Sequence, residues 1–485
     1  MTPPSSTGTG AGGWEPVIGL EVHCELRTET KLFCGCRNAF GDEPNTNVCP
    51  VCLGLPGSLP VVNAMAVDFA MRIGTALHCE IRPSLFHRKN YFYPDMPKDY
   101  QISQYDEPIN INGFLELSDG TRVGVERAHM EEDTGKTTHV GGGGRIHDAE
   151  HSLVDYNRAG VPLVEIVSRP DIRSAAQARL YAAELRGILM ATGASDGRME
   201  EGSMRVDANV SVRRPGDEFG TRCEIKNLNS LRSLVRAIEY EITRQIGVLE
   251  SGGTVAQQTR HWDEDQAKTG ALRSKEEAFD YRYFPEPDLV RLAPDAAWQA
   301  DVAAAVGAMP AERRAALDAL LGPDGSSEAR SDQISTVVEH GLDALMKRAV
   351  EGGIGAALAL ARTANEASAA PERARALDTG AYTTLLRMEQ DGTLSATQAK
   401  VVLGDLLEHG GDPAELARRR GFEAMAADSL SAVVGELIDA HPKEWARYIG
   451  GEEQLAGFFT GLAMKATNKQ ANGKAVVAEL KARRG

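Results

Sequence analysis

Apolar and polar residues alternate along several short runs in the first 295 residues of this chain. The clearest run is VIGLEVHCEL, residues 17–26, whose even-numbered positions are all apolar. Because strand side chains alternate between two faces, one face of the predicted strand suits a core, while the other carries Glu21, His23 and Glu25. That polar face is either a solvated surface or the floor of a cation site.

The same alternation recurs in three later runs: RVDANVSVR (205–213), TRCEIKN (221–227) and VGVERAHMEED (123–133). Each run alone is explained by a solvated strand face. Merged in space, the polar faces would form a carboxylate-lined site for a hard divalent cation, flanked by Arg and Lys side chains for phosphate. The polar residues are Arg205, Asp207, Asn209, Ser211, Arg213, Arg222, Glu224, Lys226, Arg127, His129 and Glu131, with Glu132 next in the chain.

The character of the pattern changes near residue 295. Before it, alternating runs mix with helical patches at 181–189 and 231–249, which predicts an α+β domain with an antiparallel sheet over residues 14–294. Beyond the Pro-rich stretch YFPEPDLVRLAPD, the chain is rich in Ala, Leu, Glu and Arg at helical spacing. This second part is predicted to be all-α.

Two further boundaries follow from breaks in the pattern. The EHGGDP stretch, residues 408–413, separates a predicted helical domain, 295–408, from a predicted C-terminal helical tail, 409–485. Residues 1–13, MTPPSSTGTGAGG, lack the features of a signal peptide and are predicted to be a disordered leader. Four consecutive glycines, 141–144, predict a flexible loop tip.

Composition narrows the class of protein. The chain has 485 residues and a formal net charge of -16, which argues against attraction of the whole molecule to nucleic acid. It has no apolar run of about 18 residues, so no membrane span is predicted. Seven unevenly placed cysteines favour a reducing, cytoplasmic setting.

One segment of the chain is basic, although the chain as a whole has a negative net charge. Residues 465–485 carry six cations and one acid, Glu479. The segment is either a nucleic-acid-binding patch or a solvated helix end, where cations are favoured by the helix dipole. The cations are Lys465, Lys469, Lys474, Lys481, Arg483 and Arg484.

Two close cysteine pairs form the sharpest local motif. Cys34 and Cys36 are followed, after twelve residues, by Cys49 and Cys52. Four thiolates at this spacing predict a tetrahedral Zn²⁺ site, which would be structural because no coordination position stays open. The alternative is two unrelated pairs of free thiols.

Two other segments bear on nucleotide binding. GKTT, residues 135–138, resembles the end of a phosphate-binding loop, but Met130 stands where the first glycine is required. Lys136 could still contact a phosphate from another geometry. Residues 86–109 are dense in aromatic residues, Pro and Lys, which suits core packing and turns, or a wall around a nucleotide or the end of an RNA chain.

Six motifs occur in a fixed order: VIGLEVHCEL, HRKNYFYPDMPKDYQISQ, HMEEDTGKTTH, EEGSMRVDANVSVR, EIKNLNS and DYRYFPEPDL. Together they resemble the B-subunit family of glutamine-dependent aminoacyl-tRNA amidotransferases. The resemblance runs from about Trp14 to the C-terminus. It implies a cradle-shaped catalytic domain resembling the glutamine synthetase fold, followed by helical domains.

The resemblance implies an ATP-dependent carbon–nitrogen ligase. The family phosphorylates the side-chain carboxylate of Glu on tRNA(Gln), or of Asp on tRNA(Asn), and ammonia then gives the amide. A carboxylate is a poor acyl donor, whereas an acyl phosphate has phosphate as its leaving group. Such phosphoryl transfer depends on positioning and on charge neutralisation by metal ions, so ATP and Mg²⁺ are the expected cofactors.

By motif, the resemblance assigns Mg²⁺ ligands and phosphate contacts. Strand alternation favours Glu131 as the partner of His129, whereas the resemblance favours Glu132, which would require a bulge. The implied ligands are Glu21, His23, Glu131 or Glu132, Asp207 and Glu224, of which Glu21, His23, Asp207 and Glu224 are also expected to be catalytic. The expected ATP contacts are Lys136, Arg205 and Lys226.

The chain lacks an amidase signature of the GGSSGG kind, and Cys79 and Cys223 lie in apolar runs, so neither is a convincing glutaminase cysteine. The resemblance implies that ammonia comes from an A subunit, with a small C subunit completing a heterotrimer, and that the helical tail helps to grip the misacylated tRNA. The VGGGGRIHDAE stretch after His139 is longer than is typical of the family.

Two other functions remain open at this point. One is a zinc-bearing tRNA-binding scaffold without chemistry, which the complete set of carboxylate motifs argues against. The other is a stand-alone ammonia ligase acting on a small substrate, which the basic tail argues against.

Overall fold

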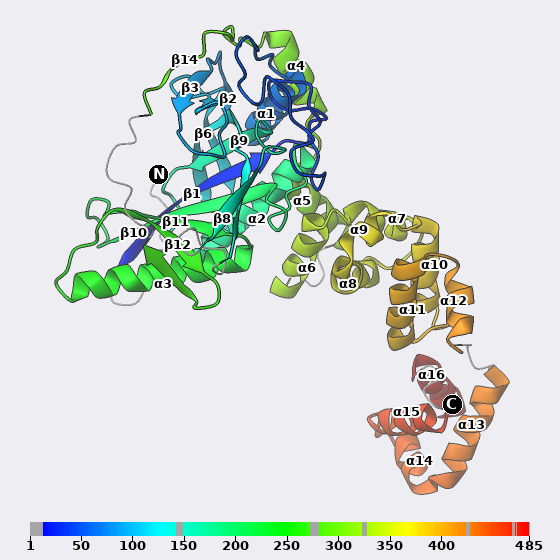
Figure 1. Cartoon of the computed structure of the whole chain (residues 1–485). Coiled ribbons are helices and arrows are strands. Elements are labelled where there is room, and N and C mark those ends of the chain that lie inside the picture. The colour runs from blue at the N-terminus through cyan, green and yellow to red at the C-terminus, as the bar shows by residue number, and fades with distance from the viewer. Residues whose placement is uncertain are drawn as a thin grey trace. The chain divides into compact units, whose positions relative to one another are not determined.

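The computed structural model describes residues 13–141, 149–271, 281–322, 327–422, 427–467, 471 and 473–484. The chain divides into two compact units, Met1–Pro310 and Ala311–Gly485, and each is described by itself (Figure 1). The predicted leader, apart from residue 13, and residues 142–144 of the predicted loop tip lie outside the described residues.

The first unit is built on a twelve-stranded sheet. Its strands follow the order β13-β12-β11-β10-β1-β9-β6-β4-β3-β14, and β5 joins β2 to β6. The strands are β1 (Glu15–Glu25), β2 (Glu80–Ile81), β3 (His87–Asn90), β4 (Tyr100–Ser103), β5 (Asn110–Glu116), β6 (Arg122–Glu132), β9 (Pro162–Ser168), β10 (Met204–Arg213), β11 (Cys223–Leu228), β12 (Gln258–Asp263), β13 (Lys268–Ala271) and β14 (Phe284–Pro285). A separate hairpin pairs β7 (Lys136–Val140) with β8 (His151–Asp155).

The sheet is mixed, because one pair of strands runs in parallel. β11 and β12 pair with Cys223 opposite Gln258, while the other pairs of the main sheet are antiparallel. The α+β class is confirmed, but the prediction of an antiparallel sheet is wrong at this pair. The predicted helix at 231–249 is α3 (Leu231–Glu250), which lies between β11 and β12, and such a crossover lets two strands run in the same direction.

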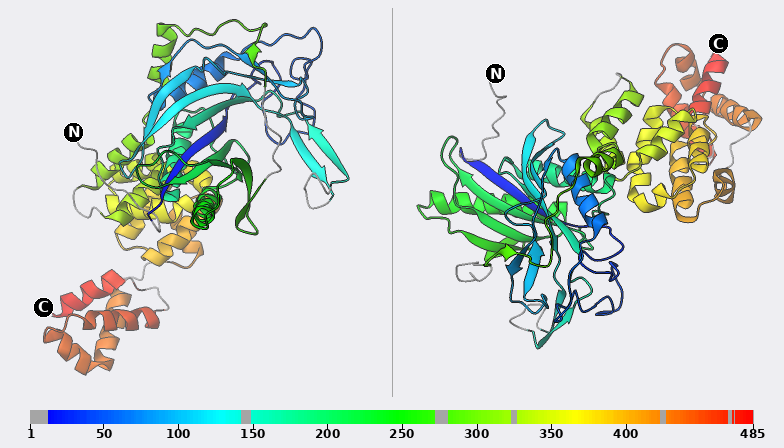
Figure 2. Two further views of the ribbon diagram at one scale, coloured as in Figure 1. Left: turned by 90° about the vertical axis from the view of Figure 1, so that its left-hand side faces the viewer. Right: turned by 90° about the horizontal axis from the view of Figure 1, so that it is seen from above.

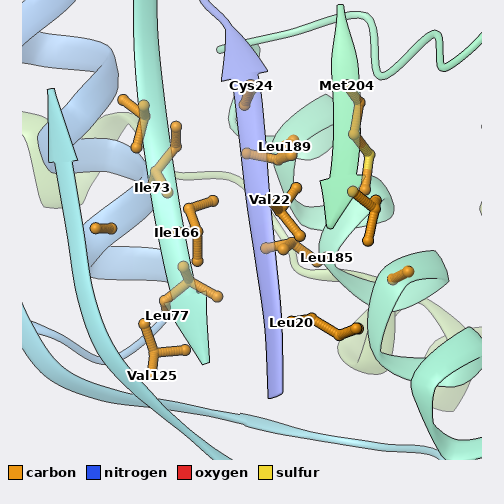
Figure 3. Packing of buried hydrophobic residues seen from close by; sticks show 14 of the residues in the cluster. Leu20, Val22, Cys24, Ile73, Leu77, Val125, Ile166, Leu185, Leu189 and Met204 are labelled. Carbon is orange, nitrogen blue, oxygen red and sulfur yellow. The ribbon is translucent and has the colours of Figure 1, made fainter. Parts of the chain in front are cut away.

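Helices cover the apolar face of the sheet. The buried cluster joins β1 to α1 (Ala64–Ala76), α2 (Ala175–Ala191) and α3. Figure 3 shows Leu20, Val22 and Cys24 of β1 beside Leu185 and Leu189 of α2. Burying each large apolar side chain contributes about 1.5–3 kcal/mol, so the apolar half of the alternation holds β1 in the centre of the fold with its polar half facing away from the helices.

Side-chain caps start these three helices where the apolar patterns begin. Asn63 accepts hydrogen bonds from the backbone at the start of α1, Ser174 does so at α2, and Ser230 does so at α3. Each cap satisfies a backbone N–H group that the first helical turn leaves without a partner, typically worth about 1 kcal/mol.

The first unit extends beyond the boundary predicted at residue 294. α4 (Ala296–Ala305) packs on α1, with Val302 in the buried cluster and Trp298 against it. Trp298 Nε1 also lies 3.4 Å from Asp68 Oδ1. The composition of this segment matches the helices that follow it, but its apolar side chains pack on the core of the preceding unit.

The described parts of the second unit are helical, with no strand among them (Figure 2). One buried cluster spans Leu317 to Ala417 and another spans Leu430 to Leu480. The helices are α5 (Pro310–Leu321), α6 (Glu328–Glu339), α7 (Asp343–Glu351), α8 (Ala356–Asn365), η2 (Ala367–Ala369), α9 (Pro371–Arg375), α10 (Thr379–Gln390), α11 (Ala396–His409), α12 (Pro413–Arg419), α13 (Ala427–Ala440), α14 (Pro442–Ile449), α15 (Leu455–Ala466) and α16 (Gly473–Arg484). Among the described residues, no helix is long and apolar enough to cross a membrane.

The glycine-containing break at 408–413 ends a helix without ending a core. α11 stops at His409, and Asp412 caps α12, whose Leu416 and Ala417 belong to the same buried cluster as α11. The division between the two clusters of the second unit therefore falls after Ala417, beyond the predicted boundary at residue 408.

Candidate metal and phosphate site

Four neighbouring strands carry a row of ionisable side chains across the sheet. The pairing of β10, β1, β9 and β6 sets Arg205 opposite His23, His23 opposite Glu165, and Glu165 opposite His129. Two positions further along the same two strands, Asp207 of β10 lies opposite Glu21 of β1. Since residues directly opposite one another share a face, the polar halves of the alternating runs meet on one side of the sheet.

Two sets of three ligand atoms lie close together in this row. His23 Nε2 is 3.5 Å from Glu165 Oε2, 3.7 Å from Glu131 Oε1 and 4.0 Å from Glu21 Oε1. His129 Nε2 is 3.7 Å from Glu165 Oε2. Donor atoms of Glu21, His23 and Glu165 lie within 4.8 Å of one another, and so do those of His129, Glu131 and Glu165, so Glu165 belongs to both sets.

The negative charge of one carboxylate in this cluster disfavours the ionisation of the others. Burial and the charge of Glu165 raise the pKa of both Glu21 and Glu131 to about 7. Burial also disfavours the anion of Glu165, but His129, the hydrogen bond with His23, and Arg127 hold its pKa well below the ordinary value. Carboxylates that oppose one another's ionisation in this way are the groups that a bound divalent cation stabilises.

The two histidines differ in charge, although His129 is buried and His23 is largely so, with 18% of its side chain exposed. Burial lowers the pKa of His129 to about 4, so its ring is neutral near pH 7. Burial acts on His23 in the same sense, but its hydrogen bond with Glu165 and the charge of Glu131 raise its pKa to about 9. A cation entering beside His23 would displace that proton, because only a neutral imidazole nitrogen can be a ligand.

Lys226 joins two further carboxylates beside the row. Its Nζ lies 2.9 Å from Asp207 Oδ2 and 2.7 Å from Glu224 Oε1. Thr259 Oγ1 donates to the other oxygen of Glu224 at 2.9 Å. Burial disfavours the ammonium, but the charges of Asp207 and Glu224 outweigh it and raise the pKa of Lys226 above its ordinary value.

Arg205 lies on β10, the strand next to that of Lys226, and is held by another carboxylate. Its Nη2 donates to Asp133 Oδ2 at 2.9 Å, and Arg158 Nε lies 3.4 Å from the same oxygen. Arg158 also donates to the carbonyl oxygens of Thr134 and Gly135, both at 3.0 Å. The Arg205 guanidinium thus stands in a fixed orientation beside the carboxylates, with about a third of its side chain exposed.

Glu131 and Glu132 lie on opposite faces of β6. Glu131 faces the cluster, whereas Glu132 forms a buried ion pair with Lys98 and accepts a hydrogen bond from the Ile102 backbone at 2.8 Å. The pairing of β6 with β9 is regular through both residues, and its one register shift lies between Val125 and Arg127. The bulge that would turn Glu132 inward is therefore missing from this stretch.

Glu165 belongs to the cluster although the sequence reasoning did not select it. It lies in PLVEIVS, the central strand β9, as one acid within an apolar run. A carboxylate in a strand with no alternation of its own is the signal that could have found it, because such a strand is buried and the charge needs partners there.

Lys136 lies apart from these residues in the sheet order. It begins β7 in the separate hairpin, and its side chain is exposed.

The aromatic segment 86–109 divides between two environments. Phe86 is buried in the core, whereas Tyr93 and Tyr105 are exposed.

The four cysteines come together in one cluster. Their Sγ atoms all lie within 4.8 Å of one another, with Cys49 and Cys52 3.8 Å apart. The hydrogen bond from Cys34 lowers the pKa of Cys52 to about 5. Lys31, which is fully buried, donates from Nζ to the carbonyl oxygens of Asn47 at 2.8 Å and Tyr156 at 3.2 Å, fixing the loop between the pairs. Four thiol groups at these separations suit a tetrahedral ion.

The basic C-terminal segment is partly neutralised within its own helices. Arg483 Nε pairs with Glu479 at 2.8 Å, and Arg484 Nη1 lies 3.4 Å from Glu453. Lys465 and Lys481 are exposed. Lys469 and the side chain of Lys474 lie outside the described residues.

Comparison with known proteins shows the family of this chain. Residues 16–300 match the GatB/GatE catalytic domain, and residues 358–483 match the GatB domain. Three relatives are each named as the B subunit of an aspartyl/glutamyl-tRNA(Asn/Gln) amidotransferase. The protein of Frankia casuarinae is 50% identical over 96% of this chain and 94% of its own length. That of Streptomyces avermitilis is 48% identical over 95% and 93%. That of Mycobacterium tuberculosis is 48% identical over 95% and 92%. The chain therefore belongs to the family of aspartyl/glutamyl-tRNA(Asn/Gln) amidotransferase B subunits.

Proposed function

We propose that this chain activates the side-chain carboxylate of Glu on tRNA(Gln), or of Asp on tRNA(Asn), with ATP, and that ammonia then converts it to the amide. The observation that carries the proposal is the row of carboxylates and histidines across β10, β1, β9 and β6. Membership of the family, over nearly the whole chain, supports the same reaction.

The chemistry needs two displacements. A carboxylate oxygen of the aminoacyl group forms a bond to the γ-phosphorus of ATP, and the bond to ADP breaks. Ammonia then forms a bond to the acyl carbon, phosphate leaves with its electron pair, and the nitrogen loses a proton. The first displacement depends on holding two anions together, so a site of this kind must supply positive charge near the phosphates.

The donor set fits Mg²⁺. Its oxygen ligands are hard, and carboxylates are the usual protein groups around this ion. Bound Mg²⁺ would neutralise charge on the ATP phosphates. The ligands we propose are His23, Glu131 and Glu165 in one set, and Glu21, Asp207 and Glu224 in a second.

Two cations on the neighbouring strands β10 and β11 have a separate role in this proposal. Arg205 and Lys226 would bind phosphate oxygens and orient the triphosphate along the sheet. Both already pair with carboxylates, Arg205 with Asp133 and Lys226 with Asp207, which sets their direction before substrate enters. Lys136 is exposed on the separate hairpin and is not part of the proposed site.

A structural Zn²⁺ bound by Cys34, Cys36, Cys49 and Cys52 is the second proposed ion. The mutual distances of the four Sγ atoms support it, and four protein ligands would leave no position for substrate. The loop that it would hold is anchored by Lys31 to Tyr156, directly after β8, so the ion would stabilise the segment that connects β8 to β9.

The partners follow from the reaction and the family. Ammonia would come from an amidase-type A subunit, a small C subunit would complete the heterotrimer, and the exposed cations of the C-terminal helices would contact tRNA.

The resemblance of the sheet to the cradle of the glutamine synthetase fold is proposed too. One helix-covered face and one carboxylate-bearing face support it.

The test is ADP formation by the assembled complex with Mg²⁺ and without glutamine. We expect turnover with glutamyl-tRNA or aspartyl-tRNA, and none with uncharged tRNA or free glutamate. Glu165→Gln should reduce turnover on the order of 100-fold or more, because it removes a proposed ligand whose Oε2 lies 3.5 Å from His23 Nε2 and 3.7 Å from His129 Nε2. Glu116→Gln, an exposed acid at the end of β5, is the matched control and should retain turnover. ADP formation that ignores the aminoacyl group, or survives Glu165→Gln, would refute the proposal.

A further inference from the structure

The face that carries the carboxylate cluster continues past β6 onto the neighbouring strands. Ser103 of β4 lies opposite Glu131, His87 of β3 lies opposite Ser103, and Pro285 of β14 lies opposite His87. Neighbouring strands are about 4.8 Å apart, so His87 lies about 10 Å across the sheet from Glu131. An extended nucleoside triphosphate can bridge this distance.

Two tyrosines stack at that end of the face. The rings of Tyr105 and Tyr283 lie 3.9 Å apart between centroids, with 6° between their planes. The Tyr105 ring also meets His87 edge-on, with centroids 6.4 Å apart. Tyr283 stacks on one side of the Tyr105 ring, yet Tyr105 is 53% exposed, which leaves surface of this residue for a further flat ring.

A lysine connects this pair to the carboxylates. Lys89 lies on β3, two residues from His87, so both side chains are on the same face. Its Nζ is 4.7 Å from the ring centroid of Tyr281, which itself meets Tyr283 edge-on at 5.9 Å. In the strand order β6-β4-β3-β14, the strand of Lys89 lies between β6, which carries Glu131, and β14, which follows Tyr281 and Tyr283 in the chain. A cation therefore lies between the aromatic rings and the proposed metal ligands.

We propose that Tyr105, backed by Tyr283, stacks on the adenine ring of ATP, with Lys89 beside the phosphates. This inference rests on the proposed ATP-dependent function and adds its base-binding residues. An exposed aromatic ring supplies a face for a base without base-specific hydrogen bonds. The cation between the rings and the carboxylates suits a triphosphate better than the terminal nucleoside of an aminoacylated tRNA, which carries a single phosphodiester.

The experiment measures binding of Mg²⁺–ATP to the assembled complex by calorimetry, with inorganic tripolyphosphate as a second probe that lacks the base. Tyr105→Ala should weaken ATP binding about tenfold and leave tripolyphosphate binding unchanged, because only the base contact is removed. Tyr105→Phe keeps the ring and should bind both probes like the wild type. Phe219→Ala, which removes another exposed aromatic side chain, is the matched control and should change neither affinity.

Three results would overturn the inference. They are an unchanged affinity of Tyr105→Ala for ATP, an equal loss for ATP and tripolyphosphate, or a rise in KM for the misacylated tRNA with ATP binding unchanged. The last would assign the ring to the terminal nucleoside of the tRNA. Failure of the proposed function is a different result, in which the wild-type complex binds neither ATP nor tripolyphosphate, or binds ATP without forming ADP on misacylated tRNA.

Discussion

The acid Glu241 and the cluster of acids around Glu165 have opposite surroundings in the first unit. Glu241 of α3 is fully buried and accepts hydrogen bonds from Arg244 at 2.6 Å, Gln245 at 2.9 Å and Thr269 at 3.0 Å. Burial alone would raise its pKa, but those partners hold it below the ordinary value. The carboxylates of Glu21 and Glu131 have the reverse shift, because burial and then the charge of Glu165 raise the pKa of each, and their cations do not outweigh these two causes.

The difference separates a structural acid from a binding one. Glu241 has all its partners within the fold, where it ties α3 to β12 and β13 through Arg260 and Thr269. The cluster around Glu165 instead brings the donor atoms of several carboxylates and histidines within 4.8 Å of one another, and it stands on the polar face of the sheet. A fold retains such a costly arrangement where an added cation or substrate completes it.

The largest expected effect is on stability at Glu241. Glu241→Ala should lower the free energy of unfolding by about 3–5 kcal/mol, because it leaves the buried Arg260 and the half-buried Arg244 without their carboxylate partner. Urea-induced unfolding of the full chain measures it. Glu239→Ala, an exposed acid on the same helix, is the control. A loss below about 1 kcal/mol, the range of a surface ion pair, would remove the distinction between the two groups of acids.

The second prediction distinguishes the adjacent acids Glu131 and Glu132 of β6 by their effect on the Mg²⁺ requirement. Glu131→Gln should raise the Mg²⁺ concentration for half-maximal ADP formation about 10–100-fold, while Glu132→Gln should change it about twofold or less. The reason is that Glu131 faces the cluster, whereas Glu132 pairs with Lys98 on the other face. A magnesium titration of both variants in the assembled complex decides it. A larger shift for Glu132→Gln would contradict the proposed ligand set.

The smallest expected effect is a pH dependence. The pKa of Glu241 is below its ordinary value of 4.5, so its stabilisation is present above pH 4.5 and is lost as pH falls through the folded-state pKa. The difference in unfolding free energy between the wild type and Glu241→Gln should therefore shrink with acidification below about pH 4.5. Glu239→Gln should show no such trend. A difference independent of pH in this range would mean that Glu241 is not ionised in the fold.

Local pattern was enough to predict a large part of this molecule. Alternation in VIGLEVHCEL and RVDANVSVR predicted strands that the structure has as β1 and β10, with their apolar residues buried. Helical spacing predicted α3 and the helical second unit. These features depend on residues close together in sequence, where the period of the pattern reports the conformation directly.

Strand register decided what the pattern left open. Glu165 enters the cluster only because β9 lies between β1 and β6, and a run of apolar residues does not reveal its neighbours. The choice between Glu131 and Glu132 depends on a regular pairing with β9, since one bulge would exchange the two faces. The true end of the first unit depends on where Trp298 and Val302 pack.

The sequence by itself determined which strands have a charged face, where the helices lie and which family the motifs resemble. Only the tertiary structure decided which acids share a site, which acid has an ion pair instead, and which tyrosine presents an open ring beside them. The physical reason is that a charge acts over a few ångströms in space, while residues brought within that distance, such as His23 and Glu165, are far apart along the chain.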